Sequence, residues 1–277
     1  MMARISAKLG ALALCCLFTS VSAGRADDAP TAADPKATVR YSQAAIGRQL
    51  GNHVLLDDDG AVVDLAAYRG KPLVVNLVYT SCADICPMVV QNLSRAVDAA
   101  QAALDADNFA VVTIGFDAVH DTPTRMAAFA RSQGIDQPNW RFLSADKETI
   151  GKLSEELGFI FYASPKGFDH VAQTTVVDRD GRIYRQVYGA DFEIPALVEP
   201  LKDVVFGRGG AITGLDGLLD RIRLFCTVYD PLRDRYRFSY TIFITIIGGA
   251  LSLGAVGVVL LRAIIRLWRR EARELSG

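Results

Sequence analysis

The sequence predicts an α/β protein: a mixed β-sheet covered by helices on both faces, followed by one transmembrane helix near the C-terminus. Three observations lead to this prediction. Short apolar or β-branched runs alternate with segments of helical periodicity between Val39 and Phe206. Two hairpin patterns flank the alternating runs, which predicts antiparallel strands beside a parallel core. A long uncharged apolar run extends from Phe238 to Leu261.

The composition narrows the classes of function. The chain is 51% hydrophobic and 22% charged, with a formal net charge of −1. These values fit a folded core and exclude both a polybasic nucleic-acid binder and a disordered acidic chain, so no nucleic-acid partner is expected. The mean hydropathy of +0.21 is high for a water-soluble domain. Some apolar residues are therefore expected in segments that lipid buries.

The N-terminus has the pattern of a secretory signal peptide. Arg4 and Lys8 precede the apolar run Leu9–Ala23, which closes on small residues. Residues 1–23 are therefore predicted to be removed on export, together with Cys15 and Cys16. The mature chain keeps three cysteines: Cys82, Cys86 and Cys226. Three exported cysteines do not form an even disulfide framework.

The apolar run near the C-terminus predicts a membrane anchor. At about 1.5 Å per residue, a helix over residues 238–261 crosses a hydrocarbon core of roughly 30 Å. Arginines flank this run on both sides, so the positive-inside rule does not orient it. The signal peptide does: residues 262–277 become a cytoplasmic tail. We expect a single-pass protein of a bacterial-type inner membrane, with a periplasmic domain at 39–206, a linker at 24–38 and a juxtamembrane segment at 207–237.

The first half of the domain reads as a hairpin followed by a β–α unit. Val54–Leu56 and Ala61–Leu65 flank an Asp-Asp-Asp-Gly turn, which predicts two short antiparallel strands. The run Pro72–Thr80 is nearly all apolar, as expected for a central strand buried on both faces. Apolar residues then recur at helical spacing over Pro87–Leu104.

The second half repeats this pattern and ends in another hairpin. The expected elements are a strand over Ala110–Phe116, helices over Pro123–Gln133 and Lys147–Leu157, strands over Thr174–Val177 and Ile183–Tyr188, and a last helix from about Pro195. A proline opens the first of these helices, and glycines 134 and 158 end the first two.

The candidate site is the sequence Cys82-Ala83-Asp84-Ile85-Cys86-Pro87. It follows a buried strand and opens a helix, the place where open α/β sheets carry their functional sites. Residues four apart on a helix share one side, so both sulfurs can face the same way. The amides and dipole of a helix N-terminus favour thiolate over thiol. Two adjacent thiolates can bind a soft metal or form a disulfide.

Further metal ligands have to come from few residues. His170 follows a loop at Ser164–Asp169 and precedes a predicted strand, so it could project toward the cysteine loop. His120 lies in a polar turn and is expected to be exposed, whereas His53 is interpreted as structural. Met88 could offer a thioether, but it is expected to fill the core face of the helix.

Three stretches resemble one known family. Leu56–Pro87, the turn Asp117–Pro123 and the pair Asp169-His170 are similar to the SCO/SenC family. Members are membrane-anchored, thioredoxin-like copper-binding proteins that assist assembly of the dinuclear copper centre of cytochrome c oxidase. The resemblance implies a thioredoxin-like fold for the domain. It also implies that Cys82, Cys86 and His170 bind Cu(I) or Cu(II), and that the partner is the copper-bearing oxidase subunit or another periplasmic copper protein.

The ligand chemistry agrees with copper. Two thiolates and one imidazole suit Cu(I), and three protein ligands leave the metal accessible for transfer. Oxidation of Cys82 and Cys86 to a disulfide would abolish binding. The prediction is therefore a copper chaperone rather than an enzyme.

Two alternatives remain open. The first is a membrane-anchored thiol-disulfide oxidoreductase that uses Cys82 and Cys86 without metal. It is less favoured because three residues separate the cysteines and Val171–Thr175 contains no proline, unlike thioredoxin-type catalysts. The second is a transmembrane metal sensor, for which the short tail at 262–277 gives little support.

Overall fold

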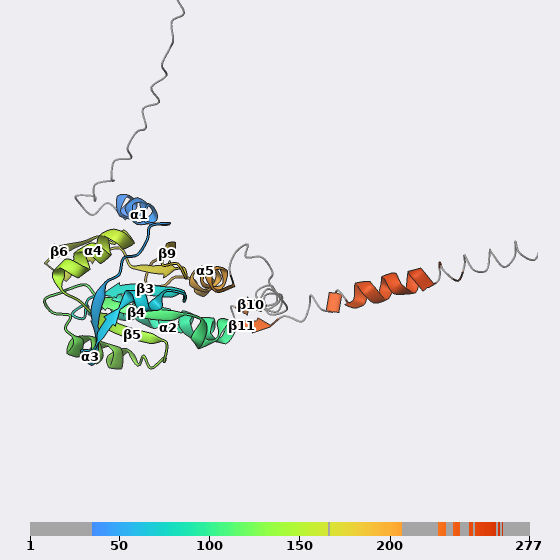
Figure 1. The fold of residues 1–277 in the computed structure, drawn as a ribbon, viewed down its shortest axis with the longest axis horizontal. Coiled ribbons are helices and arrows are strands. Elements are labelled where there is room, and N and C mark those ends of the chain that lie inside the picture. The colour runs from blue at the N-terminus through green and yellow to red at the C-terminus, as the bar shows by residue number, and fades with distance from the viewer. Residues whose placement is uncertain are drawn as a thin grey trace, which may run out of the picture.

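The computed structural model describes residues 35–165, 167–206, 227–230, 235–238, 244–245, 247–258, 260 and 262. Within these residues the chain forms a seven-stranded sheet in the order β2-β1-β5-β4-β3-β8-β9 and two separate two-stranded hairpins, β6–β7 and β10–β11 (Figure 1). The strands are β1 (Val54–Asp57), β2 (Val62–Asp64), β3 (Leu73–Val78), β4 (Ala110–Gly115), β5 (Trp140–Ser144), β6 (Phe161–Ser164), β7 (Gly167–His170), β8 (Gln173–Val177), β9 (Ile183–Tyr188), β10 (Thr227–Asp230) and β11 (Arg235–Phe238). The helices are α1 (Pro35–Gln43), α2 (Ile85–Leu104), α3 (Pro123–Gln133), α4 (Lys147–Leu157) and α5 (Ile194–Phe206), with 3₁₀ turns η1 (Leu65–Tyr68) and η2 (Ala106–Asn108).

The predicted mixed sheet is confirmed. Strands β3, β4 and β5 run parallel, whereas β8 and β1 pair antiparallel to β3 and β5 on either side of them. Every residue of β3 and of β4 is buried, which explains their nearly continuous apolar sequence. The carboxyl ends of these two strands therefore open side by side, and the predicted cysteine loop follows the first of them.

Helices cover both faces of the sheet, as expected. Helix α2 packs against α5 and α3 on one face, where Phe129 of α3 lies 6.3 Å from the Phe142 ring of β5. Helices α4 and α1 lie over the other face: Gln173 of β8 donates a hydrogen bond to the last turn of α4 and accepts one from Ser42 of α1 (Figure 1). Helices thus cover the core on both sides, and the loops at the carboxyl ends of the strands are the segments left to form a site.

The helix boundaries follow the predicted proline and glycine signals, and the structure adds a side-chain cap at the start of α3 and of α4. Thr122 accepts a hydrogen bond from the Arg125 amide, and Pro123 occupies the first turn of α3. Asp146 accepts from the Thr149 amide at the start of α4. Both helices end on glycines in the left-handed region, among them Gly158 with φ of +64°.

Three elements differ from the sequence-based expectation. Strand β5 was not predicted, although it is a central strand of the sheet. The segment Ser164–Asp169, predicted as a loop, contributes to the β6–β7 hairpin, and His170 is the last residue of β7. Helix α1 begins at Pro35, inside the range predicted as linker, so ordered structure starts before Val39.

The C-terminal part is described in pieces. Strands β10 and β11 pair as an antiparallel hairpin, and β11 lies beside α2. Residues 247–258 are helical, within the predicted span 238–261. Among the described residues, no helix combines the length and the apolar character that crossing a bilayer requires. The predicted signal peptide, residues 24–34, most of the juxtamembrane segment with Cys226, and the tail from residue 263 lie outside the described residues.

Candidate metal centre

The two cysteines lie together where β3 passes into α2. Helix α2 begins at Ile85, so Cys86 is in its first turn while Cys82 is still in the loop. Cys86 is 1% exposed, and Cys82 is half-buried; both are free thiols. The Cys86 amide donates a hydrogen bond to Cys82 Sγ over 3.4 Å. Asp84, at the N-cap position, makes no side-chain cap, so the sulfur of Cys82 takes that role.

The two thiols differ in acidity. Burial raises the pKa of Cys82, but hydrogen bonds from the amides of Cys86 and Asp84 and from the side chains of Cys86 and Tyr79 outweigh burial, so the pKa of Cys82 is lowered. Burial, together with the neighbouring Cys82, raises the pKa of Cys86 well above the ordinary thiol range. The site therefore pairs an accessible nucleophilic sulfur with a buried protonated one.

A buried carboxylate fixes the cysteine loop to the end of β4. Asp121, 2% exposed, accepts hydrogen bonds from the Thr80 amide at 2.8 Å, the Thr80 hydroxyl at 2.7 Å and the Asp117 amide at 2.9 Å. A Cβ on Gly115 would collide with the Asp121 side chain, so a glycine there permits this close approach. Burial raises the pKa of Asp121 despite these donors. Asp121 thus joins the turn after β4 to the residues just before Cys82.

Tyr79 connects the dithiol with His170. Its phenol hydrogen-bonds to Cys82, and its ring meets the His170 ring edge-on with centroids 6.0 Å apart. Burial, followed by the contact with Cys82, raises the pKa of Tyr79 to about 12, so the phenol stays protonated and can donate to a thiolate. The side chain stands at the end of the central strand, between the two groups that the sequence predicted as ligands.

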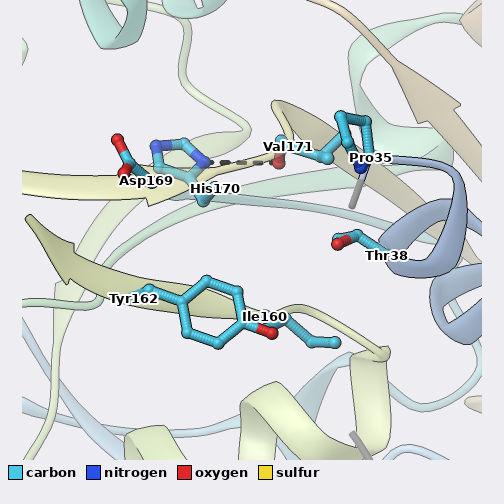
Figure 2. Close-up of a pocket in the computed structure, with 7 residues that line it drawn as sticks. All are labelled: Pro35, Thr38, Ile160, Tyr162, Asp169, His170 and Val171. Carbon is cyan, nitrogen blue, oxygen red and sulfur yellow. Dashed lines mark hydrogen bonds between the residues drawn. The ribbon is translucent and has the colours of Figure 1, made fainter. Parts of the chain in front are cut away.

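His170 lies in a cluster of aromatic rings. Its ring centroid is 5.2 Å from that of Phe116 and 5.5 Å from that of Phe159. Burial lowers the pKa of His170, so the imidazole is neutral at pH 7, the form that binds metals. Nδ1 lies 3.3 Å from the carbonyl oxygen of Val171 (Figure 2). If Nδ1 donates to this oxygen, the lone pair of Nε2 is available to a ligand.

A small cavity borders His170 on the side of α1. It has a volume of about 110 Å³ and is lined by Pro35, Thr38, Ile160, Tyr162, Asp169, His170 and Val171 (Figure 2). The imidazole is therefore not enclosed by packed side chains on every side.

The predicted ligands are neighbours without forming a finished metal site. Cys82 and Cys86 are in contact, and Tyr79 touches both this pair and His170. Among the described residues, no three His, Cys, Asp or Glu side chains are placed to hold one metal ion. The donor types suit a soft metal, but binding through all three residues requires movement of His170 toward the sulfurs.

The other candidates lie elsewhere. His120 is exposed, as predicted, and its Nδ1 is 2.8 Å from a carboxylate oxygen of Asp117. His53 is 8% exposed and contacts Glu156 over 2.7 Å, which agrees with its structural interpretation. The expectation for Met88 was wrong: its side chain is 48% exposed, because it points away from the face of α2 that packs on the core.

Sequence reasoning missed Tyr79 and Asp121. Tyr79 ends an apolar run, so it read as one more buried strand residue, although a tyrosine at the end of such a run needs a partner for its hydroxyl. Asp121 stands in a polar turn that predicts exposure. The Thr-Pro cap that follows shows where α3 starts, but no local pattern shows that the carboxylate turns inward to Thr80.

The amino-acid sequence is similar to those of known proteins of one family. The sequence model of the SCO1/SenC family matches residues 43–205. The mitochondrial SCO2 homologue of Bos taurus is 31% identical over 147 residues, 53% of this chain and 52% of the relative; the chain thus spans about half of that protein's length. The SCO1 homologue of Bacillus subtilis is 25% identical over 141 residues, 49% of this chain and 71% of the relative.

The fold comparison points the same way. A solved structure from Aquifex aeolicus is 26% identical with a TM-score of 0.54, and the alignment covers 60% of this chain and 96% of the other. The mixed sheet with its flanking helices confirms the predicted thioredoxin-like fold. With more than half of its length matched by the family, this chain belongs to the SCO1/SenC family.

Proposed function

We propose that this protein is a membrane-tethered copper chaperone that binds one copper ion through Cys82, Cys86 and His170. The observation that carries the proposal is the pair of free thiols of unequal acidity at the β3–α2 junction, beside a neutral imidazole. Thiolate and imidazole are the ligands that favour Cu(I). Three ligands leave one side of the metal open for exchange with an acceptor.

The residues around the ligands have separate tasks in this proposal. Tyr79 donates a hydrogen bond to Cys82 and favours the thiolate form of this sulfur. Cys86 loses its proton when copper binds, because the metal replaces the proton on the sulfur. His170 then closes on the two sulfurs from the end of β7.

The proposal places the domain outside the cytoplasm, tethered to a bacterial-type inner membrane. A signal peptide at 1–23 exports the chain, and the apolar run 238–261 anchors it with the tail 262–277 in the cytoplasm. The exposed apolar side chains of the helix at 247–258 support this anchor: Leu251 is 70% exposed and Leu253 76%. Such a helix requires a lipid or protein environment.

Membership of the SCO1/SenC family supports the choice of client. We infer that the acceptor is the copper-bearing subunit of cytochrome c oxidase, or another exported copper protein with a soft-metal site. An acceptor of this kind supplies thiolates that can displace Cys82, Cys86 and His170 one at a time, so that the metal is never free in solution.

The test is copper analysis of the reduced fragment 35–206 after exposure to a competing Cu(I) chelator. The wild type retains one copper per chain, and Cys82→Ser/Cys86→Ser retains none. His170→Ala weakens retention, while His120→Ala, the matched change of an exposed histidine at the same end of the sheet, leaves it unchanged. Equal retention by His170→Ala and the wild type would remove His170 from the ligand set.

A thiol-disulfide oxidoreductase is the second candidate, and the difference in acidity between the two thiols favours it. In such an enzyme Cys82 attacks a substrate disulfide, and Cys86 resolves the mixed disulfide. This function predicts rapid disulfide exchange by metal-free protein and nearly unchanged activity in His170→Ala. Fast exchange combined with copper loss to the chelator would favour this candidate over the chaperone.

A further inference from the structure

Helix α2 separates the dithiol from the end of the domain where the C-terminal hairpin lies. The helix has 20 residues and is therefore about 30 Å long. Cys86 is in its first turn. Strand β11 lies beside the opposite end of the helix, as Figure 1 shows. The dithiol and β11 thus occupy opposite poles of the domain.

This arrangement orients the domain on its anchor. Strand β11 ends at Phe238, the residue at which the uncharged run begins. The membrane surface therefore lies close to β11 and η2, the turn that follows α2. The dithiol pole faces away from the bilayer. This orientation depends on the anchor given in the proposed function, but not on copper binding.

Two segments at the distal pole, the start of α2 and the turn after β4, carry exposed apolar side chains. Ile85 is 44% exposed, Met88 48% and Val119 74%. Ile85 and Met88 are in the first turns of α2, next to Cys86. Val119 is in the turn after β4 that Asp121 ties to the cysteine loop through Thr80. The three side chains are thus presented by two segments joined by hydrogen bonds, which makes a preformed rim.

We propose that the rim of Ile85, Met88 and Val119 is a docking surface for a water-exposed protein domain that carries its own soft-metal site about 30 Å or more from the membrane surface. Metal passes between thiolate ligands only on direct contact, so the acceptor's site must be brought against Cys82. An apolar rim excludes water around that contact and favours an acceptor whose metal site is also ringed by apolar side chains.

Other occupants do not fit this geometry. The bilayer and the chain's own anchor lie at the opposite pole. Two copies anchored in one bilayer point the same way, so their distal poles do not meet face to face. The rim therefore favours a different protein that extends above the membrane.

The orientation is tested by energy transfer in the full chain, reconstituted in a lipid nanodisc with acceptor dye on the headgroups. With the native cysteines replaced by serine, a donor is attached at Val119→Cys or, as the matched membrane-proximal position, at Asp107→Cys in η2. A height difference of about 30 Å predicts transfer from position 107 at least about twice that from position 119. Equal transfer, or more from position 119, would overturn the orientation.

The probe for the docking surface is the water-soluble copper-bearing domain of the oxidase subunit. The measurement is the affinity of this domain for the copper-loaded full chain in nanodiscs. Val119→Asp is expected to weaken binding about tenfold while leaving copper affinity unchanged. The matched control is Val62→Asp in the edge strand β2, where the valine is 72% exposed, and it is expected to bind like the wild type. Equal effects of the two variants, no effect of Val119→Asp, or no binding of this domain by the wild type would each overturn the proposal.

The two proposals fail separately. A chain that orients as predicted but loses copper to the chelator contradicts the proposed function, on which the choice of acceptor rests, and leaves the orientation standing. A chain that retains copper but shows equal energy transfer at both positions contradicts the docking geometry alone.

Discussion

Replacing Asp121 by alanine tests how the cysteine loop is held. The change removes the acceptor of three hydrogen bonds, two from Thr80 and one from the Asp117 amide. Hydrogen bonds to a charged group contribute about 1.5 kcal/mol each at the low end, or roughly 4 to 5 kcal/mol together. Burial disfavours the Asp121 charge and offsets part of this. We expect the free energy of unfolding of the reduced domain to fall by about 3 kcal/mol.

The assay is urea unfolding of the reduced fragment 35–206, followed by circular dichroism. Asp146→Ala is the matched control, because its carboxylate accepts one hydrogen bond from the Thr149 amide at the surface; it should lose much less stability than Asp121→Ala. Asp121→Asn should fall between wild type and Asp121→Ala, since it keeps an acceptor for Thr80 but turns its amide toward the Asp117 N–H. If Asp121→Ala lowered the free energy of unfolding by less than about 1 kcal/mol, the conclusion that Asp121 holds the cysteine loop in place would be refuted.

Two further predictions concern the acidity of the site. Tyr79→Phe removes a hydrogen-bond donor to Cys82 and raises the pKa of that thiol, so its alkylation by iodoacetamide at pH 7 should slow roughly fivefold or more. The control Tyr162→Phe should react like wild type. An unchanged rate in Tyr79→Phe would contradict the hydrogen bond between Tyr79 and Cys82. Burial lowers the pKa of His170 in the folded state. As the pH falls through about 6.5, the imidazole in the unfolded chain therefore takes up a proton before the imidazole in the folded protein does. The free energy of unfolding should decrease below that pH. Thermal melts should show this loss in wild type and a smaller one in His170→Gln; parallel curves would show that His170 does not contribute.

Elements with strong periodicity and clear punctuation could be predicted from the sequence. Pro123, Gly134 and Gly158 marked the helix ends to within one residue. Proline favours the first turn of a helix, and a glycine in the left-handed conformation favours its end. Strand β3 was recognisable because a strand buried on both faces carries an almost unbroken apolar run.

Elements that depend on tertiary contacts could not be predicted. Strand β5 contains Arg141 between Trp140 and Phe142, and this short alternation competes with the helix patterns on either side. The β6–β7 hairpin has Pro165 in its turn and is only half-buried, so its sequence reads as a loop.

In the candidate site, the proposed ligands could be predicted from the sequence, but the residues that position them could not. Cys82 and Cys86 are visible because a buried strand and a helix start frame them. The inward turn of Asp121 depends on hydrogen bonds from Thr80, which is distant in sequence. The contact of Tyr79 with His170 also joins residues that are distant in sequence. Such contacts arise only when the carboxyl ends of β3 and β4 are brought together.

X-ray absorption spectroscopy of the copper-loaded, reduced full chain tests the central claim most directly. The chaperone proposal predicts Cu(I) with two sulfur neighbours and one nitrogen, and the outer-shell scattering of an imidazole. In His170→Ala the imidazole scattering should disappear while both sulfurs remain, and in His120→Ala the spectrum should match that of wild type. A wild-type spectrum without imidazole scattering, or with imidazole scattering that survives in His170→Ala, would contradict the proposed ligand set.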